Sequence, residues 1–278
     1  MLIKSFIPHL LIVINLCWST YQEAQAQECK LEVYNGSLKV RLPNGDYKTG
    51  KQLVGGSFTV GDKNRFRIKI KSARIDPKDI YKEIVLYKMA LVTKSGKERN
   101  ICSPDPHGNT SAIIIAGRSH PDGTLSLTPE DSFEIACTAG FQAKCIRAGY
   151  APWRKTKDGK SMLDWFNSCV RMFRADYCGD GRHFTRNGTL IEFYDHIGIN
   201  NPTDEPNYKF EASWCPAGAT CVEKTRIPSI ITLDGLEKTC PKLKGKEGYK
   251  TCSKRSGALL FNHSKDYTRH PVVVPLAT

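Results

Sequence analysis

Hydrophobic and polar side chains alternate along residues 65–71, where Phe66, Ile68 and Ile70 occupy every second position. Four basic residues fill the other positions: Arg65, Arg67, Lys69 and Lys71. A period of two is typical of a β-strand with one buried and one exposed face. The pattern therefore predicts a strand whose outer face is strongly basic.

Other apolar stretches in the first half of the chain also have the length of strands. Residues 84–92 form the strongest of them, and the turn-forming residues 94–97 end it. Shorter stretches occupy residues 112–116 and 132–136. The region 27–135 is therefore expected to be rich in β-structure.

The apolar spacing becomes helical in the middle of the chain. Residues 139–148 have a helical composition and are followed by a glycine. A second stretch has five residues spaced as one face of an α-helix: Met162, Phe166, Cys169, Val170 and Phe173. Ser161 is placed to cap its start, with Asp164 three residues later, and Gly179 and Gly181 are placed to end it.

The tight-turn pair Asn187-Gly188 and the alternating residues 189–194 predict one more strand, and residues 272–274 between two prolines suit a short edge strand. We therefore expect an α+β protein. Its β-rich N-terminal part is expected to be packed against a disulfide-stapled part with two helices and short strands. The expected organisation is a signal peptide at 1–26, the β-rich region 27–135, a cysteine-rich α+β region 136–235 and a basic C-terminal extension 236–278.

The first 26 residues have the organisation of a secretory signal peptide. Lys4 gives a positive start, residues 6–17 are almost wholly apolar, and Ala24-Gln25-Ala26 supplies the small-x-small pattern before a cleavage site. The apolar run is shorter than the about 20 residues that a transmembrane helix needs. A lipid anchor at Cys17 is the other alternative, but Leu16 precedes it where a small residue is usual. We expect an exported protein, periplasmic or extracellular, with no transmembrane segment after cleavage.

Ten cysteines follow the signal peptide: Cys29, Cys102, Cys137, Cys145, Cys169, Cys178, Cys215, Cys221, Cys240 and Cys252. An even number in an exported chain predicts up to five disulfides and leaves their pairing open. Structural zinc sites use cysteine pairs with roughly two to four residues between them, and even Cys215 and Cys221 are further apart. We therefore expect disulfides, and no metal or other cofactor.

Several motifs resemble one known family. Cys169-Val170-Arg171-Met172 and the following Arg174-Ala175-Asp176-Tyr177-Cys178-Gly179-Asp180-Gly181 resemble the signature of the bacterial ADYC-domain family. More of the family's motifs occur in the same order, between about Gly56 and Ile227: Ala136-Cys137-Thr138, Lys144-Cys145, Gly149-Tyr150-Ala151-Pro152-Trp153, Asn187-Gly188-Thr189 and Tyr194-Asp195-His196-Ile197-Gly198-Ile199. Ala151 stands where the family commonly has lysine. The family comprises exported proteins of uncharacterised function, so the resemblance carries over no catalytic residue.

The resemblance also divides the cysteines into two groups. Six match the family's pattern: Cys102, Cys137, Cys145, Cys169, Cys178 and Cys221. The remaining four look like additions that would form two extra disulfides: Cys29, Cys215, Cys240 and Cys252.

Carboxylates and imidazoles concentrate after the second predicted helix. Asp176, Asp180 and His183, followed by Asp195 and His196, could serve acid–base chemistry or hold Ca²⁺ through several oxygens. The structural alternative is that the aspartates accept hydrogen bonds from the backbone of a glycine-rich turn.

A cysteine nucleophile is a further alternative for the same region. Cys169 or Cys178 could pair with His183, although an oxidising compartment favours disulfides at both positions. The chain has no phosphate-binding glycine loop, no His-Glu-x-x-His sequence and no Gly-x-Ser-x-Gly sequence. An enzyme is therefore the less favoured interpretation.

The chain carries a net charge of +13, which cleavage of the signal peptide leaves unchanged because one lysine and one glutamate are lost. Such a charge attracts anionic surfaces and polymers. The basic face of residues 65–71 and the lysine-rich tail are the expected patches, unless these side chains only solvate the surface. Nucleic acid is not expected as a partner, because no basic helix or aromatic stacking platform is apparent.

These observations favour a non-catalytic binding or structural module that engages anionic components of an envelope or of the extracellular space. The alternative is a secreted hydrolase with its active site around Asp176, Asp180 and His183. The sequence leaves the oligomeric state open.

Overall fold

A computed structural model describes residues 29–61, 65–127, 132–203, 205–248, 252 and 257–266. The chain forms two compact units. Unit 1 runs to His120 and resumes at Leu125–Trp153, and unit 2 comprises Pro121–Thr124 and the chain from Arg154 onward. The predicted signal peptide and the predicted edge strand 272–274 lie outside the described residues.

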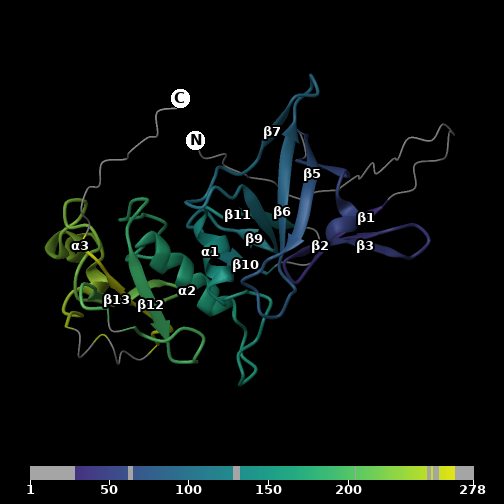
Figure 1. The fold of residues 1–278 in the computed structure, drawn as a ribbon. Helices are drawn as coiled ribbons and strands as arrows, with labels where there is room; N and C mark the ends of the chain where they lie inside the picture. Colours follow the sequence, from purple (N-terminus) through teal and green to yellow (C-terminus); the bar gives the residue numbers. More distant parts are fainter. Residues whose placement is uncertain are drawn as a thin grey trace. The chain divides into compact units, whose positions relative to one another are not determined.

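Unit 1 is built from antiparallel sheets (Figure 1). Its first sheet has the order β1-β2-β3, with bounds Lys30–Tyr34, Ser37–Arg41 and Tyr47–Thr49. The 3₁₀ turn η1 (Gly50–Leu53) leads to a six-stranded sheet of order β11-β8-β6-β5-β4, in which β7 also pairs with β6. The bounds of these strands are β4 Ser57–Val60, β5 Phe66–Ile75, β6 Val85–Val92, β7 Glu98–Asn100, β8 Ser111–Ala116 and β11 Phe133–Cys137. The short strands β9 (Arg118–Ser119) and β10 (Leu125–Ser126) pair with each other.

The core of unit 1 lies between these sheets and follows the predicted alternation. Ile68 and Ile70 of β5 are buried, together with Val85, Tyr87 and other residues of β6. Phe66 departs from the prediction, because it begins the strand and is exposed. A register shift between Ile70 and Ser72 then interrupts the alternation, as expected where a β-bulge inserts a residue.

The helix α1 (Phe141–Arg147) agrees with the sequence prediction and contacts β11. It therefore belongs to unit 1, whose second segment ends at Trp153. The expected organisation instead placed a boundary at residue 135, before this helix.

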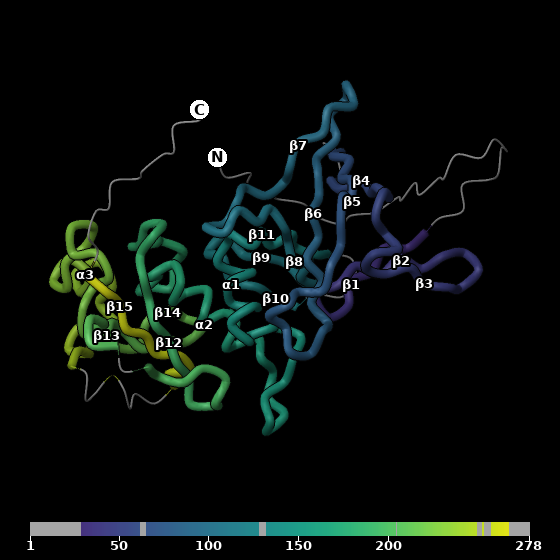
Figure 2. Tube along the Cα trace, viewed as in Figure 1, coloured from purple at the N-terminus to yellow at the C-terminus, as the bar shows by residue number. Residues whose placement is uncertain are grey.

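Unit 2 has a four-stranded antiparallel sheet of order β12-β15-β13-β14 (Figure 2). The bounds are β12 Ile191–Asp195, β13 Lys209–Cys215, β14 Gly218–Val222 and β15 Leu260–Ser264. The helix α2 (Leu163–Arg174) contacts β13, β14 and β15. Because β15 lies between β12 and β13, part of the predicted C-terminal extension forms an inner strand of this sheet.

The ends of α2 differ from the prediction. Ser161 lies one residue before the N-cap, but its hydroxyl still accepts a hydrogen bond from the amide of Leu163, at 3.2 Å. The helix ends at Ala175, which takes a left-handed conformation with φ 49°. Gly179 and Gly181, predicted to end the helix, lie in the turn that follows.

A third helix was not predicted. The short helix α3 (Leu233–Thr239) contains a glycine, which weakened its pattern, and is followed by the 3₁₀ turn η2 (Pro241–Leu243). Thr232 caps α3 by accepting a hydrogen bond from Gly235. Within the described part of the chain, no helix is long and apolar enough to cross a bilayer. The fold is mixed α+β and rich in β-structure, as predicted.

Candidate functional site

Residues 175–181, which carry the family-like signature, connect α2 to the rest of unit 2. Ala175, Asp176 and Tyr177 are fully buried. The left-handed turn at Ala175 reverses the chain, and the amide of Asp176 donates to the carbonyl of Arg171 at 2.9 Å. This geometry directs the side chains of Asp176 and Tyr177 into the interior instead of toward solvent.

The Asp176 carboxylate organises the glycine turn. It accepts hydrogen bonds from the amides of Gly179 at 2.9 Å, Asp180 at 3.2 Å and Gly181 at 2.9 Å. Its Oδ2 also accepts a hydrogen bond from Arg171 Nη1 at 2.6 Å. Four donors occupy most of the lone pairs of this carboxylate. Asp176 therefore accepts hydrogen bonds from the backbone of the glycine-rich turn, which is the structural role considered as the alternative to acid–base chemistry.

Arg171 joins this carboxylate to a second one. The guanidinium is almost fully buried and donates to Asp122 Oδ2 at 2.6 Å and to the carbonyl of Pro216 at 2.9 Å. Burial by itself raises the pKa of Asp122, but hydrogen bonds from Thr124 and Arg171 outweigh it and lower the pKa to about 2. Asp122 is therefore ionised over the ordinary range of pH.

Tyr177 enters a fully buried polar network. Its hydroxyl lies 3.0 Å from Glu211 Oε1 and accepts a hydrogen bond from the amide of Arg226 at 2.8 Å. Its ring stacks on Trp214, with ring centroids 5.2 Å apart. Burial, followed by the negative charge of Glu211, raises the pKa of Tyr177 well above its usual value. The phenol therefore stays protonated and serves as a donor to Glu211.

Arg226 and Glu211 form the centre of this network. Two guanidinium nitrogens, Nε and Nη2, donate to the two carboxylate oxygens of Glu211, each at 2.9 Å. Nη2 and Nη1 also donate to the carbonyls of Met172 and Phe173, at 2.8 and 3.1 Å. These carbonyls lie in the last turn of α2, so a buried cation satisfies the end of the helix. Asn262 Nδ2 donates to Glu211 Oε2 at 3.0 Å.

Sequence reasoning missed Glu211, Arg226 and Asn262. The available signal was a glutamate inside the mostly apolar strand sequence 210–214, since a buried acid requires a partner. The partners Arg226 and Asn262 are distant in sequence, and no spacing pattern links them to Glu211.

The remaining candidate residues do not join Asp176. Asp180 Oδ2 accepts a hydrogen bond from Arg182 Nε at 2.8 Å, and both side chains are exposed. His183 is exposed. The structure therefore places Asp180 and His183 at the surface and Asp176 in the interior, and does not gather the three side chains around a shared cavity.

Asp195 and His196 are separated in the same way. Asp195 is buried and accepts hydrogen bonds from the amides of Ile197, Ile199 and Asn200, at 2.8, 3.1 and 2.9 Å. His196 is exposed, and its ring lies 4.4 Å from the ring of Phe261. Among the described residues, no three His, Cys, Asp or Glu side chains are grouped to hold a metal ion.

Eight of the ten cysteines form disulfides. Cys102 pairs with Cys137 in unit 1, and Cys178 pairs with Cys240 and Cys221 with Cys252 in unit 2. Cys145 and Cys169 are also disulfide-bonded. Both cysteines proposed as nucleophiles, Cys169 and Cys178, are therefore oxidised.

Two expectations about the cysteines require correction. Cys29 and Cys215 are free thiols. Cys240 and Cys252, expected to pair among the four added cysteines, instead pair with Cys178 and Cys221 of the family pattern. These bonds attach the chain after residue 239 to the body of unit 2.

The predicted basic face lies on β5 and is partly neutralised. Glu98 of β7 accepts hydrogen bonds from Lys69 Nζ at 2.9 Å and Lys71 Nζ at 2.5 Å. The bond from Lys71, and then that from Lys69, lower the pKa of Glu98. Arg67 Nε donates to the hydroxyl of Ser57. Arg65 is exposed at the start of the strand.

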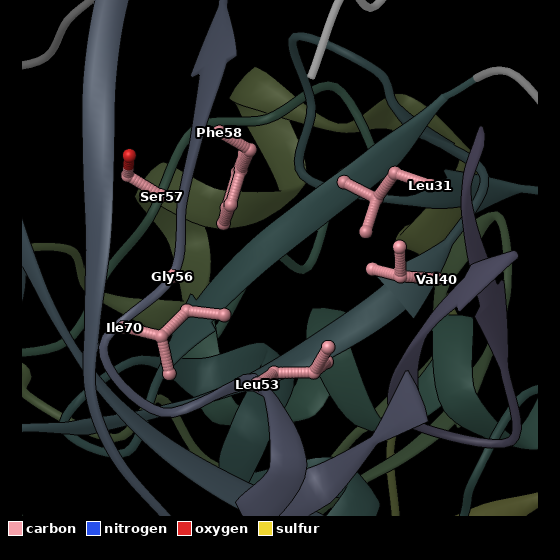
Figure 3. A pocket seen from close by; sticks show the side chains of 7 residues that line it. All are labelled: Leu31, Val40, Leu53, Gly56, Ser57, Phe58 and Ile70. Carbon is pink, nitrogen blue, oxygen red and sulfur yellow. The ribbon is translucent and has the colours of Figure 1, made fainter. Parts of the chain in front are cut away.

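One pocket lies in unit 1, lined by Leu31, Val40, Leu53, Gly56, Ser57, Phe58 and Ile70 (Figure 3). Its cavity has a volume of about 10 Å³, at the lower limit for a single water molecule. The lining is almost wholly apolar, and none of the candidate acid–base residues contributes to it. The pocket is therefore a packing gap in the core.

Comparison with protein families gives one match: the model of the ADYC domain matches residues 50–228. No curated protein and no solved structure matches the chain. The matched region covers more than half of the chain and includes the buried turn 175–181. The chain therefore belongs to the ADYC-domain family.

Proposed function

We propose that this protein is an exported, non-catalytic binding module that engages anionic components of an envelope or of the extracellular space. The observation that carries the proposal is the basic face of β5. Arg65, Arg67, Lys69 and Lys71 follow one another along this strand, and Glu98 is the acid bonded to two of them. An array of cations with so little compensation attracts polyanions.

The geometry of the signature supports the same proposal. The carboxylates of Asp176 and Asp195 accept internal backbone hydrogen bonds, and Glu211 is held by Arg226. These groups stabilise the fold and are not presented to a substrate. The exposed cations of unit 1 are presented to solvent, and this favours recognition by charge.

Export is supported by the disulfides, which form and persist in oxidising compartments. The signal-like sequence of residues 1–26 supports the same localisation, periplasmic or extracellular.

The proposal is tested by retention of the mature protein on a sulfated dextran matrix and on neutral dextran. We expect retention on the sulfated matrix alone, with elution by moderate salt because exposed charges are screened. Replacing Lys69 and Lys71 by Gln should weaken retention, and Glu98→Gln should strengthen it. The matched control replaces Lys155 and Lys157, exposed lysines of unit 2 outside the basic C-terminal extension, by Gln. Equal retention of the wild-type protein on both matrices would contradict the proposal.

The hydrolase hypothesis has less support, because Asp176, Asp180 and His183 do not converge. Asp180 is exposed and can be changed without altering the core. If any hydrolytic activity is detected, Asp180→Asn tests whether this region is responsible for it.

A further inference from the structure

The loop between β5 and β6 displays apolar side chains to solvent. Within residues 76–84, Ile80 is 80% exposed and Tyr81 is 66% exposed. Among the large hydrophobic residues of the described chain, Ile80 has the largest exposed fraction. A large aliphatic side chain left in water forgoes the favourable free energy of burial. The exposure of Ile80 is therefore unfavourable for the protein in water.

The loop is held in this conformation by two buried aspartates. Asp79 accepts hydrogen bonds from the amides of Tyr81 at 3.2 Å, Glu83 at 2.8 Å and Ile84 at 2.9 Å. Asp76 accepts a hydrogen bond from the amide of Lys78 at 3.1 Å. Its carboxylate also forms an ion pair with Arg147 Nε at 2.7 Å. The backbone beneath Ile80 is thus fixed, and the exposure is built into the fold.

A second exposed tyrosine directly precedes a turn that contacts the loop. Asn35 Nδ2 donates to Glu83 Oε2 at 3.4 Å, and Trp153 Nε1 donates to Glu83 Oε1 at 3.1 Å. These bonds place the β1–β2 turn next to the loop, with Tyr34, 66% exposed, immediately before Asn35. Tyrosine and tryptophan are the side chains enriched where protein meets the headgroup region of a membrane.

The exposed charged side chains of the loop are positive. Lys78 and Lys82 flank Ile80 and Tyr81 and are exposed. The nearby acids are directed inward, since Asp76 and Asp79 are buried and Glu83 is held by Trp153 and Asn35. The tip therefore combines an aliphatic side chain, a tyrosine and two lysines on a hydrogen-bonded loop.

We infer that the loop 76–84, with Tyr34, docks unit 1 onto a bilayer that contains anionic phospholipid. This inference rests on the proposed function and names the anionic component. Ile80 enters the boundary between headgroups and acyl chains, the tyrosines lie at the headgroup level, and Lys78 and Lys82 contact phosphate groups. A soluble polyanion would use the lysines but offers no apolar environment for Ile80.

The test is sedimentation of the mature protein with vesicles of phosphatidylcholine and phosphatidylglycerol, compared with vesicles of phosphatidylcholine alone. We expect binding to the anionic vesicles and little to the neutral ones. The double variant Ile80→Ser, Tyr81→Ser should bind the anionic vesicles about tenfold more weakly or worse, because Ile80 no longer leaves water. Its retention on sulfated dextran should be unchanged.

Two further variants supply a matched control and a second, fluorescence readout of vesicle binding. Leu190→Ser, at an exposed leucine of unit 2, is the matched control and should bind as the wild-type protein does. Ile80→Trp should give an emission that shifts to the blue and is quenched by brominated lipid upon vesicle binding. A double variant that binds vesicles like the wild type, or an Ile80→Trp emission that vesicles leave unchanged, would overturn the inference while the proposed function stands. A wild-type protein that binds neither vesicles nor sulfated dextran would overturn both.

Discussion

Gly179 and Gly218 lie against each other in unit 2. A Cβ atom on Gly218 would lie 2.7 Å from the backbone nitrogen of Gly179, and one on Gly179 would lie 1.9 Å from the carbonyl oxygen of Ala217. Both glycines have positive φ angles. The glycine of the signature is therefore required by close backbone approach to the β13–β14 turn, and not only by its conformation.

This contact predicts that Gly179→Ala destabilises the protein severely, by at least about 4 kcal/mol, or prevents folding. The matched control is Gly188→Ala. Gly188 also has a positive φ, but a Cβ atom there meets nothing within 4 Å. Its substitution should cost only the backbone strain, about 1–2 kcal/mol. Denaturant unfolding of the oxidised proteins measures both, and equal effects of the two changes would contradict the close contact.

Removing the hydroxyl of Tyr177 tests the buried network. Tyr177→Phe leaves the amide of Arg226 without its acceptor and removes one of the donors to Glu211. A buried group that loses its partner costs about 1–3 kcal/mol. Tyr34→Phe, at an exposed tyrosine, should leave the unfolding midpoint unchanged. A Tyr177→Phe protein as stable as the wild type would show that the hydroxyl does not contribute.

Replacing glutamate by glutamine is expected to lower the stability much more at Glu211 than at Glu98. Glu211→Gln breaks a buried ion pair and leaves Arg226 uncompensated, which should cost about 3–5 kcal/mol. Glu98→Gln breaks partly exposed pairs with Lys69 and Lys71, which the solvent screens, and should leave the urea midpoint almost unchanged. Urea unfolding distinguishes the two, and similar losses of stability would be inconsistent with this assignment.

The disulfides predict a specific labelling pattern. When the unreduced protein is unfolded and treated with iodoacetamide, Cys29 and Cys215 should carry the label, and the other eight cysteines of the mature chain should not. Peptide mapping without reduction reads this directly. Label on Cys169 or Cys178 would contradict their oxidised state and would revive the cysteine nucleophile.

Acid should weaken unit 2 through Asp122. Its folded pKa, about 2, lies below the ordinary value of 3.8, so its contribution to stability is complete above about pH 4. The contribution is lost as the pH falls from about 4 toward 2, because the unfolded chain takes up the proton first. Asp122→Asn should therefore reduce stability near neutral pH and make the urea midpoint less sensitive to pH in this range. Asp234→Asn, at an exposed aspartate of α3, is the control and should retain the wild-type dependence on pH.

The elements with strong local patterns could be predicted from the sequence. The strand containing Ile68 and Ile70, the strand 85–92, and both predicted helices exist because their apolar spacing is satisfied by burial on one face. Ala175 could not be identified as the end of α2, because a left-handed alanine has no local signature and depends on the contacts that follow it.

Which members of the polar cluster are buried could be established only from the structure. Asp176, Asp180 and His183 are close in sequence, and only the fold separates the buried carboxylate from the exposed pair. The exposed loop 76–84 was missed for a related reason. Its sequence does not show that Ile80 and Tyr81 are exposed, because the conformation of the loop depends on the hydrogen bonds that its backbone donates to Asp76 and Asp79.

The burial of Asp176 and Tyr177 bears on how relatives of this chain are compared. A signature centred on buried side chains identifies chains with the same scaffold, whatever those chains recognise. Exposed segments such as the loop 76–84 can diverge without disturbing it. A ligand established for one member should therefore be transferred to another by matching Ile80, Tyr81 and their flanking lysines, and not by the shared signature.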